Sequence, residues 1–177
     1  MKIKLLITLA ISCLFTSFLS AQHKKRPVEP AFNSINDQNV YLKYKKEKFH
    51  FYNIDKSSIQ LLLGKPIKSK TAKSEISGLM YTEYTYPFGL ISIEDGLADN
   101  IEINKPGLTY FIRIDNHYSK PIEVGSDASY LQQLFPFSWK HIQDNFIIVP
   151  FEKIDCTLSF KICGSKIKSI SISYNES

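Results

Sequence analysis

The sequence predicts an α+β fold built of two pseudo-repeated units, each a short helix packed on a three- to four-stranded antiparallel sheet. Two short stretches, 54–66 and 126–136, carry helix caps and apolar residues at helical spacing. Each stretch is followed by segments in which apolar and polar residues alternate, the pattern of half-buried strands. We therefore expect one unit over 54–103 and a second over 124–172, each with its helix first.

The two units correspond at nearly constant spacing, which favours an internal repeat. Leu63 aligns with Leu134, an offset of 71 residues, and Ile101 aligns with Ile170, an offset of 69. The corresponding positions are turn or core residues, so the repeat predicts architecture and leaves function to the positions that differ. The other matches are Ser58 with Ser129, Pro66 with Pro136, and Ile103 with Ile172.

The first 21 residues are typical of an export signal. Lys2 and Lys4 precede an uncharged apolar run that ends at Leu19, and Ala21 offers a small residue for cleavage. The run is shorter than the roughly 20 residues of a spanning helix, which disfavours a membrane anchor. Lipidation at Cys13 is an alternative. We expect an exported protein, periplasmic or secreted, whose mature chain has no membrane span.

Residues 22–39 are predicted to be a disordered linker, because they are polar, contain Pro27 and Pro30, and show no periodicity. The α+β domain then spans 40–177, with its two units at about 40–115 and 116–177. The 177-residue chain carries a net charge of +5. Its early basic clusters come with no recognisable nucleic-acid module, so we expect a solvated basic surface and no nucleic-acid partner.

The first helix has clear boundaries. Asp55 can accept hydrogen bonds from the free amides of the first turn, Gly64 suits the left-handed position after the last turn, and Pro66 prevents continuation. The segment 67–77 is polar and basic and is predicted to be a loop. Strands are expected over 79–86, 90–94, 98–104 and 108–114, with a hairpin turn at Asp95-Gly96. The apolar stripe of the helix comprises Ile59, Leu62 and Leu63.

The second unit has weaker helix signals. Ser126 is the predicted cap, and Pro136 is the predicted stop of a helix whose apolar stripe includes Leu131 and Leu134. Strands are expected over 146–151, 156–162 and 169–174, the first of them at a sheet edge or bulge because of Pro150. Cys156 and Cys163 would occupy one strand, too far apart for a disulfide unless a bulge or turn intervenes.

The short helix ending Leu62-Leu63-Gly64-Lys65-Pro66, followed by aromatic-rich antiparallel strands, resembles the α+β module of the β-lactamase-inhibitor-protein-like and SmpA/OmlA-type lipoproteins. Leu134-Phe135-Pro136 repeats the pattern. The composition is similar to that of small exported Bacteroidota-type proteins. The resemblance implies helices packed on small antiparallel sheets, sometimes in tandem, in exported proteins that bind other proteins.

The sequence offers no catalytic, cofactor-binding or metal-ligating set. His23, His50, His117 and His141 have no partner at ligand spacing, apart from Asp115 near His117, which fits a polar turn. As candidate nucleophiles, Ser126 lacks the Gly-x-Ser-x-Gly motif and Cys163 precedes an ordinary turn. As candidate paired acids, Glu94 and Asp95 are adjacent at a turn. Lys65 follows a glycine but lacks the rest of a phosphate-binding loop. We expect no enzyme and no cofactor.

Aromatic residues make up 13% of the chain, and tyrosine suits binding surfaces because it combines contact area with a polar tip. Four lie off the predicted core stripes or in loops: Tyr81, Tyr118, Phe137 and Trp139. We expect a non-enzymatic protein that binds another envelope or secreted protein through a sheet face or hairpin loops. The alternatives are an envelope hydrolase, a carbohydrate- or small-ligand-binding protein, and a structural envelope component.

Overall fold

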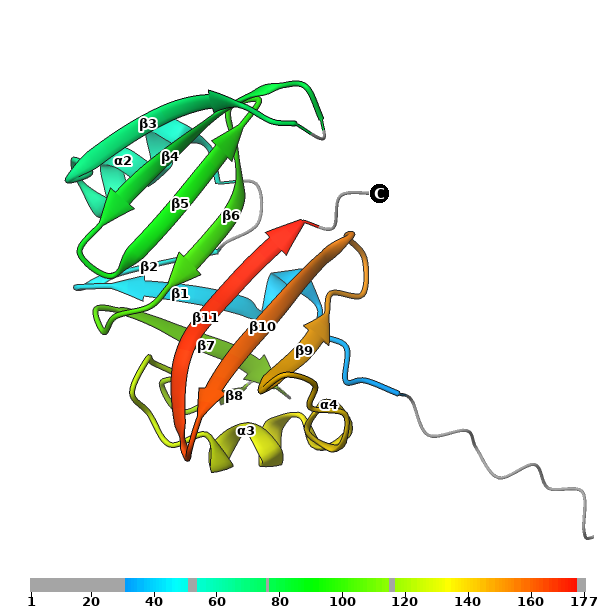
Figure 1. Cartoon of the computed structure of the whole chain (residues 1–177). Helices are drawn as coiled ribbons and strands as arrows, with labels where there is room; N and C mark the ends of the chain where they lie inside the picture. The colour runs from blue at the N-terminus through cyan, green and yellow to red at the C-terminus, as the bar shows by residue number, and fades with distance from the viewer. Residues whose placement is uncertain (1–30, 51–53, 76, 115–116, 175–177) are drawn as a thin grey trace, which may run out of the picture. The chain divides into compact units, whose positions relative to one another are not determined.

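Two antiparallel sheets carry most of the chain in a computed structural model that describes residues 31–50, 54–75, 77–114 and 117–174. The long sheet has seven strands in the order β3-β4-β5-β6-β11-β10-β9, and the short sheet has four in the order β2-β1-β7-β8 (Figure 1). The predicted α+β class with antiparallel sheets is confirmed. In the long sheet the strands are β3 (Lys68–Lys73), β4 (Met80–Tyr86), β5 (Gly89–Glu94), β6 (Leu97–Ile103), β9 (Phe146–Pro150), β10 (Cys156–Cys163) and β11 (Lys166–Tyr174). In the short sheet they are β1 (Val40–Tyr44), β2 (Glu47–His50), β7 (Leu108–Ile114) and β8 (His117–Tyr118).

The long sheet consists of two meanders, β3 to β6 and β9 to β11, joined by the pairing of β6 with β11. In that pairing Ile101 lies opposite Ile172, and Ile103 lies opposite Ile170. All four side chains are at most 1% exposed, as the alternation predicts. β9, which contains Pro150, is an edge strand, also as predicted.

The short sheet is centred on β1 and β7, which pair with Leu42 opposite Tyr110. Both of these side chains are fully buried, and they belong to the same hydrophobic cluster as the isoleucines of β6 and β11. One core is therefore shared by the inner faces of the two sheets. Aromatic contacts extend it: Tyr86 stacks on Phe88 at 5.5 Å between ring centroids, and Phe135 lies 5.8 Å from Phe160.

Helix α2 (Lys56–Leu63) has the predicted boundaries. The Asp55 carboxylate accepts a hydrogen bond from the Ser58 backbone N–H at 2.7 Å, and Gly64 follows the last turn at a φ of 79°. The hydrogen bond from Ser58 lowers the pKa of Asp55. The helix lies beside β3 and β4 (Figure 1), and Tyr86 Oη donates to the Gly64 carbonyl at 3.4 Å.

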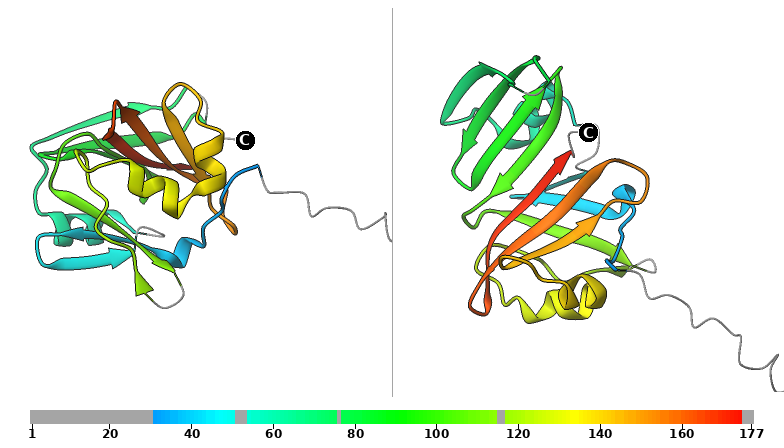
Figure 2. Two further views of the ribbon diagram at one scale, coloured as in Figure 1. Left: turned by 90° about the horizontal axis from the view of Figure 1, so that it is seen from below. Right: turned by 45° about the vertical axis from the view of Figure 1, so that its right-hand side comes forward.

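The second helical region differs from the prediction. It consists of α3 (Ser129–Leu134), which ends before Pro136 as predicted, and α4 (Pro136–Lys140), a second helix that Pro136 begins at a position that needs no N–H. Ser126 is not the cap: the Asp127 side chain accepts from the Ser129 N–H at 2.8 Å instead. Both helices lie at one end of the β9–β11 meander (Figure 2), where α4 contacts β9.

Three segments predicted to lack regular structure are ordered. Residues 67–77 contain β3, which the sequence hides because an edge strand can be polar on both faces. The predicted linker includes Ile35, which bridges to Phe151, and a 3-10 helix, η1 (Asp37–Asn39). His117 lies in β8 and not in a loop. The predicted signal peptide, 1–21, lies outside the described residues.

The cysteines occupy opposite ends of β10 as predicted, with Cys156 buried and Cys163 exposed. Burial raises the pKa of the Cys156 thiol to about 12, so this side chain acts as a protonated core residue. Within the described ranges, no helix combines the length and apolarity that crossing a bilayer requires.

Tyr110 has a buried hydroxyl with no hydrogen-bond partner among the described residues. Removing an unsatisfied buried polar group relieves its desolvation cost, so we expect Tyr110→Phe to leave stability unchanged or raise it by up to about 1 kcal/mol. Tyr86→Phe is the matched control: it removes a bonded hydroxyl and should lower stability by about 0.5–1 kcal/mol. Urea denaturation of the variants measures both effects. A clear loss of stability in Tyr110→Phe would show that this hydroxyl is satisfied in solution.

Candidate binding surface

The outer face of the short sheet combines aromatic and cationic side chains. Val40 and Leu42 point into the core, so Tyr41 and Lys43 point outward, because successive side chains of a strand alternate between faces. The cross-strand registers carry this alternation to β2, β7 and β8. We call the resulting surface the aromatic–cationic face; it comprises Tyr41, Lys43, Lys48, His50, Phe111, Arg113 and Tyr118.

The registers arrange this face in rows. The central row consists of rings, with Tyr41 between His50 on β2 and Phe111 on β7. On one side of this row, Lys43 lies opposite Lys48. On the other side, Arg113 lies opposite Tyr118. The row of rings is thus flanked, along the strand direction, by a cationic row on each side.

Lys48 crosses the face above the rings. Its Nζ lies 3.0 Å from the ring centroid of Tyr118, 4.3 Å from that of Tyr41 and 5.7 Å from that of Phe111. The negative faces of aromatic rings attract an ammonium group at these distances. Lys48 therefore connects the two edge strands, β2 and β8, across the central pair.

The electrostatics of the face act on Tyr118. The hydrogen bond from Lys48 lowers the pKa of this phenol, a second hydrogen bond from Tyr41 adds to the effect, and the charges of Lys48 and Arg113 act in the same direction. A surface that stabilises a phenolate on one of its own residues has the electrostatic potential to attract the anionic groups of a partner.

A cavity of about 390 Å³ opens at the Arg113 end of the face. Asp37 lines it, is only 4% exposed, and has an Oδ1 atom with no hydrogen-bond partner among the described residues. A buried acceptor of this kind is costly unless a donor reaches it. The cavity therefore brings a mostly buried carboxyl group, a guanidinium and two rings together; its remaining lining residues are Gln38, Asn39, Tyr41, His50 and Arg113.

The four aromatic residues that the sequence singled out are not brought together. Tyr118 belongs to the aromatic–cationic face, but Tyr81 is on β4, and Phe137 and Trp139 are on α4, where Trp139 packs against the core. The sequence reasoning missed the other members of the face. The members on β1 and β2 had a signal in the aromatic and basic residues over 41–50, whereas Phe111 and Arg113 were seen only as outward positions of an alternating strand.

The candidate chemical groups are dispersed as well. His50 is the only described histidine on the face; His117 is exposed on β8, and His141 lies 5.7 Å from the ring of Phe32. Cys163 and Lys65 are exposed, and Ser126 holds β11 through its carbonyl, which accepts from the Ile167 N–H. Asp115 and His23 lie outside the described residues.

Acidic residues gather near the β5–β6 turn, where Glu94 and Asp99 line a cavity of about 510 Å³. Glu94 accepts a hydrogen bond from Ser77 Oγ, and Asp95 occupies the turn itself at a φ of 48°. No group of three histidine, cysteine or acidic residues suited to a metal ion occurs among the described residues. The acids therefore concentrate negative charge near this turn.

Comparison with family models, with curated proteins and with solved structures finds no match to this chain.

The contact between Lys48 and Tyr118 can be tested through the pKa of Tyr118. Lys48→Gln should raise the pKa of Tyr118 toward its ordinary value of 10.0, because the donor that favours the phenolate is lost. With the folded-state pKa lowered, the unfolded chain retains the proton longer, so wild-type stability rises with pH across the interval below 10.0. That rise should shrink in the variant.

NMR titration of the tyrosine ring signals measures the shift. Lys45→Gln is the matched control, because Lys45 lies 5.1 Å from the Tyr44 ring and outside the face. An unchanged Tyr118 titration in Lys48→Gln would contradict the contact.

Proposed function

We propose that the protein is an exported, non-enzymatic binding protein that recognises another envelope or secreted protein through the aromatic–cationic face. One observation carries the proposal: a row of rings with cations at both ends lies on the outer face of a sheet whose inner face forms the core. Such a surface keeps its geometry without a ligand. Rings supply contact area at low conformational cost, and the cations select an acidic partner.

Acidic side chains also border the face. Asp37 is buried at one end, and the Glu123 carboxylate is engaged at the opposite end by the Thr109 hydroxyl at 2.8 Å. The chain as a whole is basic, with a net charge of +5. Association with an acidic surface would therefore be accelerated by electrostatic steering and weakened by salt.

The cavity favours a second candidate function, the binding of a small polar ligand such as a carbohydrate. Gln38 and Asn39 offer amides to a hydroxyl group beside the flat rings of Tyr41 and His50. The cavity is continuous with the aromatic–cationic face because Tyr41, His50 and Arg113 belong to both.

We also propose that the fold arose from two related units, as the sequence repeat and the resemblance to tandem modules imply. Equivalent backbone contacts support this. Ala98 N–H donates to the Ile54 carbonyl, and 69 residues later Ile167 N–H donates to the Ser126 carbonyl, both at 3.0 Å. Each contact ties the entry of a helix to the first residues of the last strand of its unit.

The sheets share the same relation. The β5–β6 ladder shifts register between Ser92 and Ile93, and the β10–β11 ladder shifts between Lys161 and Ile162, again 69 residues later. β1 pairs with β7, and β6 pairs with β11, so the first and last strands of the units pair with each other. The proposed units are 40–103 and 108–174, which moves β7 from the end of the first unit to the start of the second.

If the units are related, the hydrogen bonds that Asp55 and Asp127 accept at the starts of their helices should contribute similarly to stability. Asp55→Ala and Asp127→Ala each remove a carboxylate that accepts the N–H of a first-turn serine, so we expect similar decreases in the unfolding midpoint. Hydrogen bonds lower the pKa of both carboxyls below 3.8, so the contribution of each is present at neutral pH and disappears as pH falls through the lowered value.

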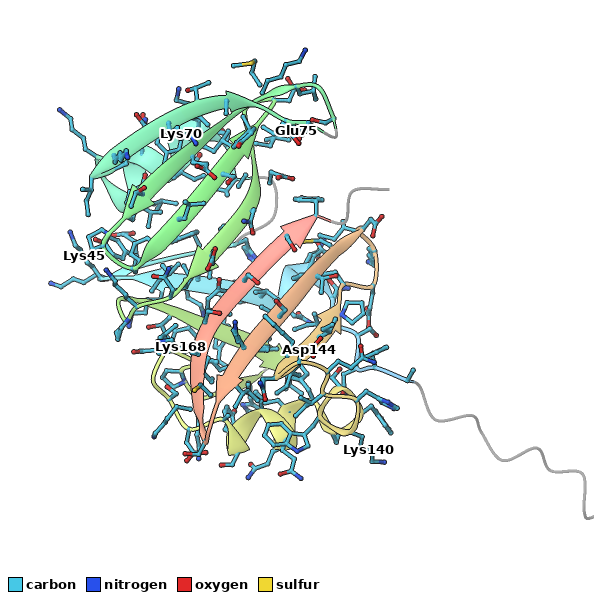
Figure 3. The ribbon with its side chains drawn as sticks, viewed as in Figure 1. Lys45, Lys70, Glu75, Lys140, Asp144 and Lys168 are labelled. Carbon is cyan, nitrogen blue, oxygen red and sulfur yellow. The ribbon has the colours of Figure 1, made fainter. Side chains whose placement is uncertain are left out.

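Thermal unfolding at neutral and acidic pH measures the comparison. Glu75→Ala, at the exposed β3–β4 turn (Figure 3), is the control and should change little. A large loss from one cap and none from the other would count against equivalent units.

Charge reversal tests the proposed binding surface. Immobilised wild-type protein should retain a partner from the envelope or secreted fraction, whereas the double variant Lys43→Glu/Arg113→Glu should lose it, because the cations at both ends become repulsive. The matched control is Lys70→Glu/Lys168→Glu, with equal charge change on β3 and β11 (Figure 3), and should retain the partner.

Retention should also fall with added salt, since about 1 M salt screens charges beyond roughly 3 Å. Equal retention by both double variants would overturn the proposed surface. Recovery of a defined small ligand in place of a protein would favour the second candidate.

A further inference from the structure

The distance between the two cationic rows of the face limits how far apart the acidic groups of a partner can be. Along β7, Arg113 lies two residues beyond Phe111 and four beyond Thr109, and Thr109 pairs with Lys43. Residues on one face of a strand recur every two positions at ~3.3 Å per residue. The cationic row at Arg113 and the cationic row at Lys43 are therefore roughly 13 Å apart along the strands, with the rings midway between them.

An extended peptide has the same period. Its side chains at positions i, i+2 and i+4 point to one side and span roughly 13 Å. An acidic residue at each end of this span and an apolar residue in the middle would match the rows, with carboxylates at Arg113 and Lys43 and the apolar side chain on Phe111, which lies farther from the Lys48 Nζ than the other two rings do. A helix would place the same positions on different sides.

The cavity supplies an anchor for one end. Arg113 can receive a carboxylate with two parallel hydrogen bonds, a geometry that a lysine cannot offer. Arg113 lines this cavity, so its positive charge marks this end of the face as the position of one acidic residue.

We propose that the aromatic–cationic face binds an extended segment of the partner protein in which two acidic residues, four positions apart, flank an apolar residue. This inference rests on the proposed function and specifies the chemistry of its partner. The acidic residue at one end lies at Arg113, and the acidic residue at the other end lies at Lys43. Lys48, held over the rings of Tyr41 and Tyr118, adds positive charge beside the path of the segment.

Peptide titration tests the spacing. The probe is acetyl-Thr-Glu-Thr-Leu-Thr-Glu-Thr-amide, and the matched control is acetyl-Thr-Thr-Glu-Leu-Glu-Thr-Thr-amide, which has the same composition but places both acids on the side away from the leucine. NMR titration of the full-length protein should show the first peptide shifting the backbone amide signals of Tyr41, Phe111 and Arg113. The control peptide should bind roughly ten-fold more weakly.

Three variants locate the contacts. Arg113→Gln and Lys43→Gln should each weaken the first peptide by roughly ten-fold, since each removes one charge-assisted contact. Lys70→Gln, on β3, should leave its affinity unchanged.

Each other outcome has a distinct meaning. Equal binding of both peptides, still dependent on Arg113 and Lys43, would overturn the spacing and leave the acidic-partner surface standing. Absence of shifts with either peptide would overturn this inference, and the retention experiment with the double variants would then decide the proposed function separately. Shifts at the same amides with an oligogalacturonate and with neither peptide would overturn the inference in favour of a carbohydrate ligand.

Discussion

The pairing of β6 with β11 is the interaction on which the rest of the structure depends. It joins two meanders that would each be a small sheet with an exposed apolar edge. Its inward-facing isoleucines, Ile101 and Ile103 against Ile172 and Ile170, are buried at the centre of the shared core. The neighbouring ladder is equally constrained, because a Cβ at Gly89 would collide with the backbone carbonyl of Glu102 on β6. Close approach of β5 and β6 thus requires glycine at that position.

The β1–β7 pairing follows from the same demand for burial, and it determines where a partner can be met. Once Leu42 and Tyr110 are committed to the core, parity leaves Tyr41, Lys43, Phe111 and Arg113 outside. None of these four side chains could point inward unless the register of its strand shifted by one residue. The aromatic–cationic face is therefore a geometric consequence of how the core is packed, and its side chains are spaced by the strands beneath them.

The sequence predicted best those elements whose boundaries depend on interactions between neighbouring residues. The boundaries of α2 follow from Asp55 and Gly64, whose roles depend only on nearby backbone groups. The alternation of Leu108, Tyr110 and Ile112 identified β7 and its inner face. The failures are also instructive. β3 carries no apolar alternation, because an edge strand is held by backbone hydrogen bonds. Ser126 does not cap α3: Ala128 precedes the helix, and the Asp127 carboxylate accepts from the Ser129 N–H.

The sequence by itself determined the α+β class, most strands and the inward residues of several of them, since caps, turns and alternation are read within a few residues. The tertiary structure alone decided which strands are neighbours. β1 meets β7 across 63 intervening residues between Tyr44 and Leu108, and only that pairing places Tyr41 beside Phe111 and sets Arg113 and Asp37 around one cavity. Such contacts depend on the burial of a core that is complete only when distant segments meet, and no local pattern encodes that.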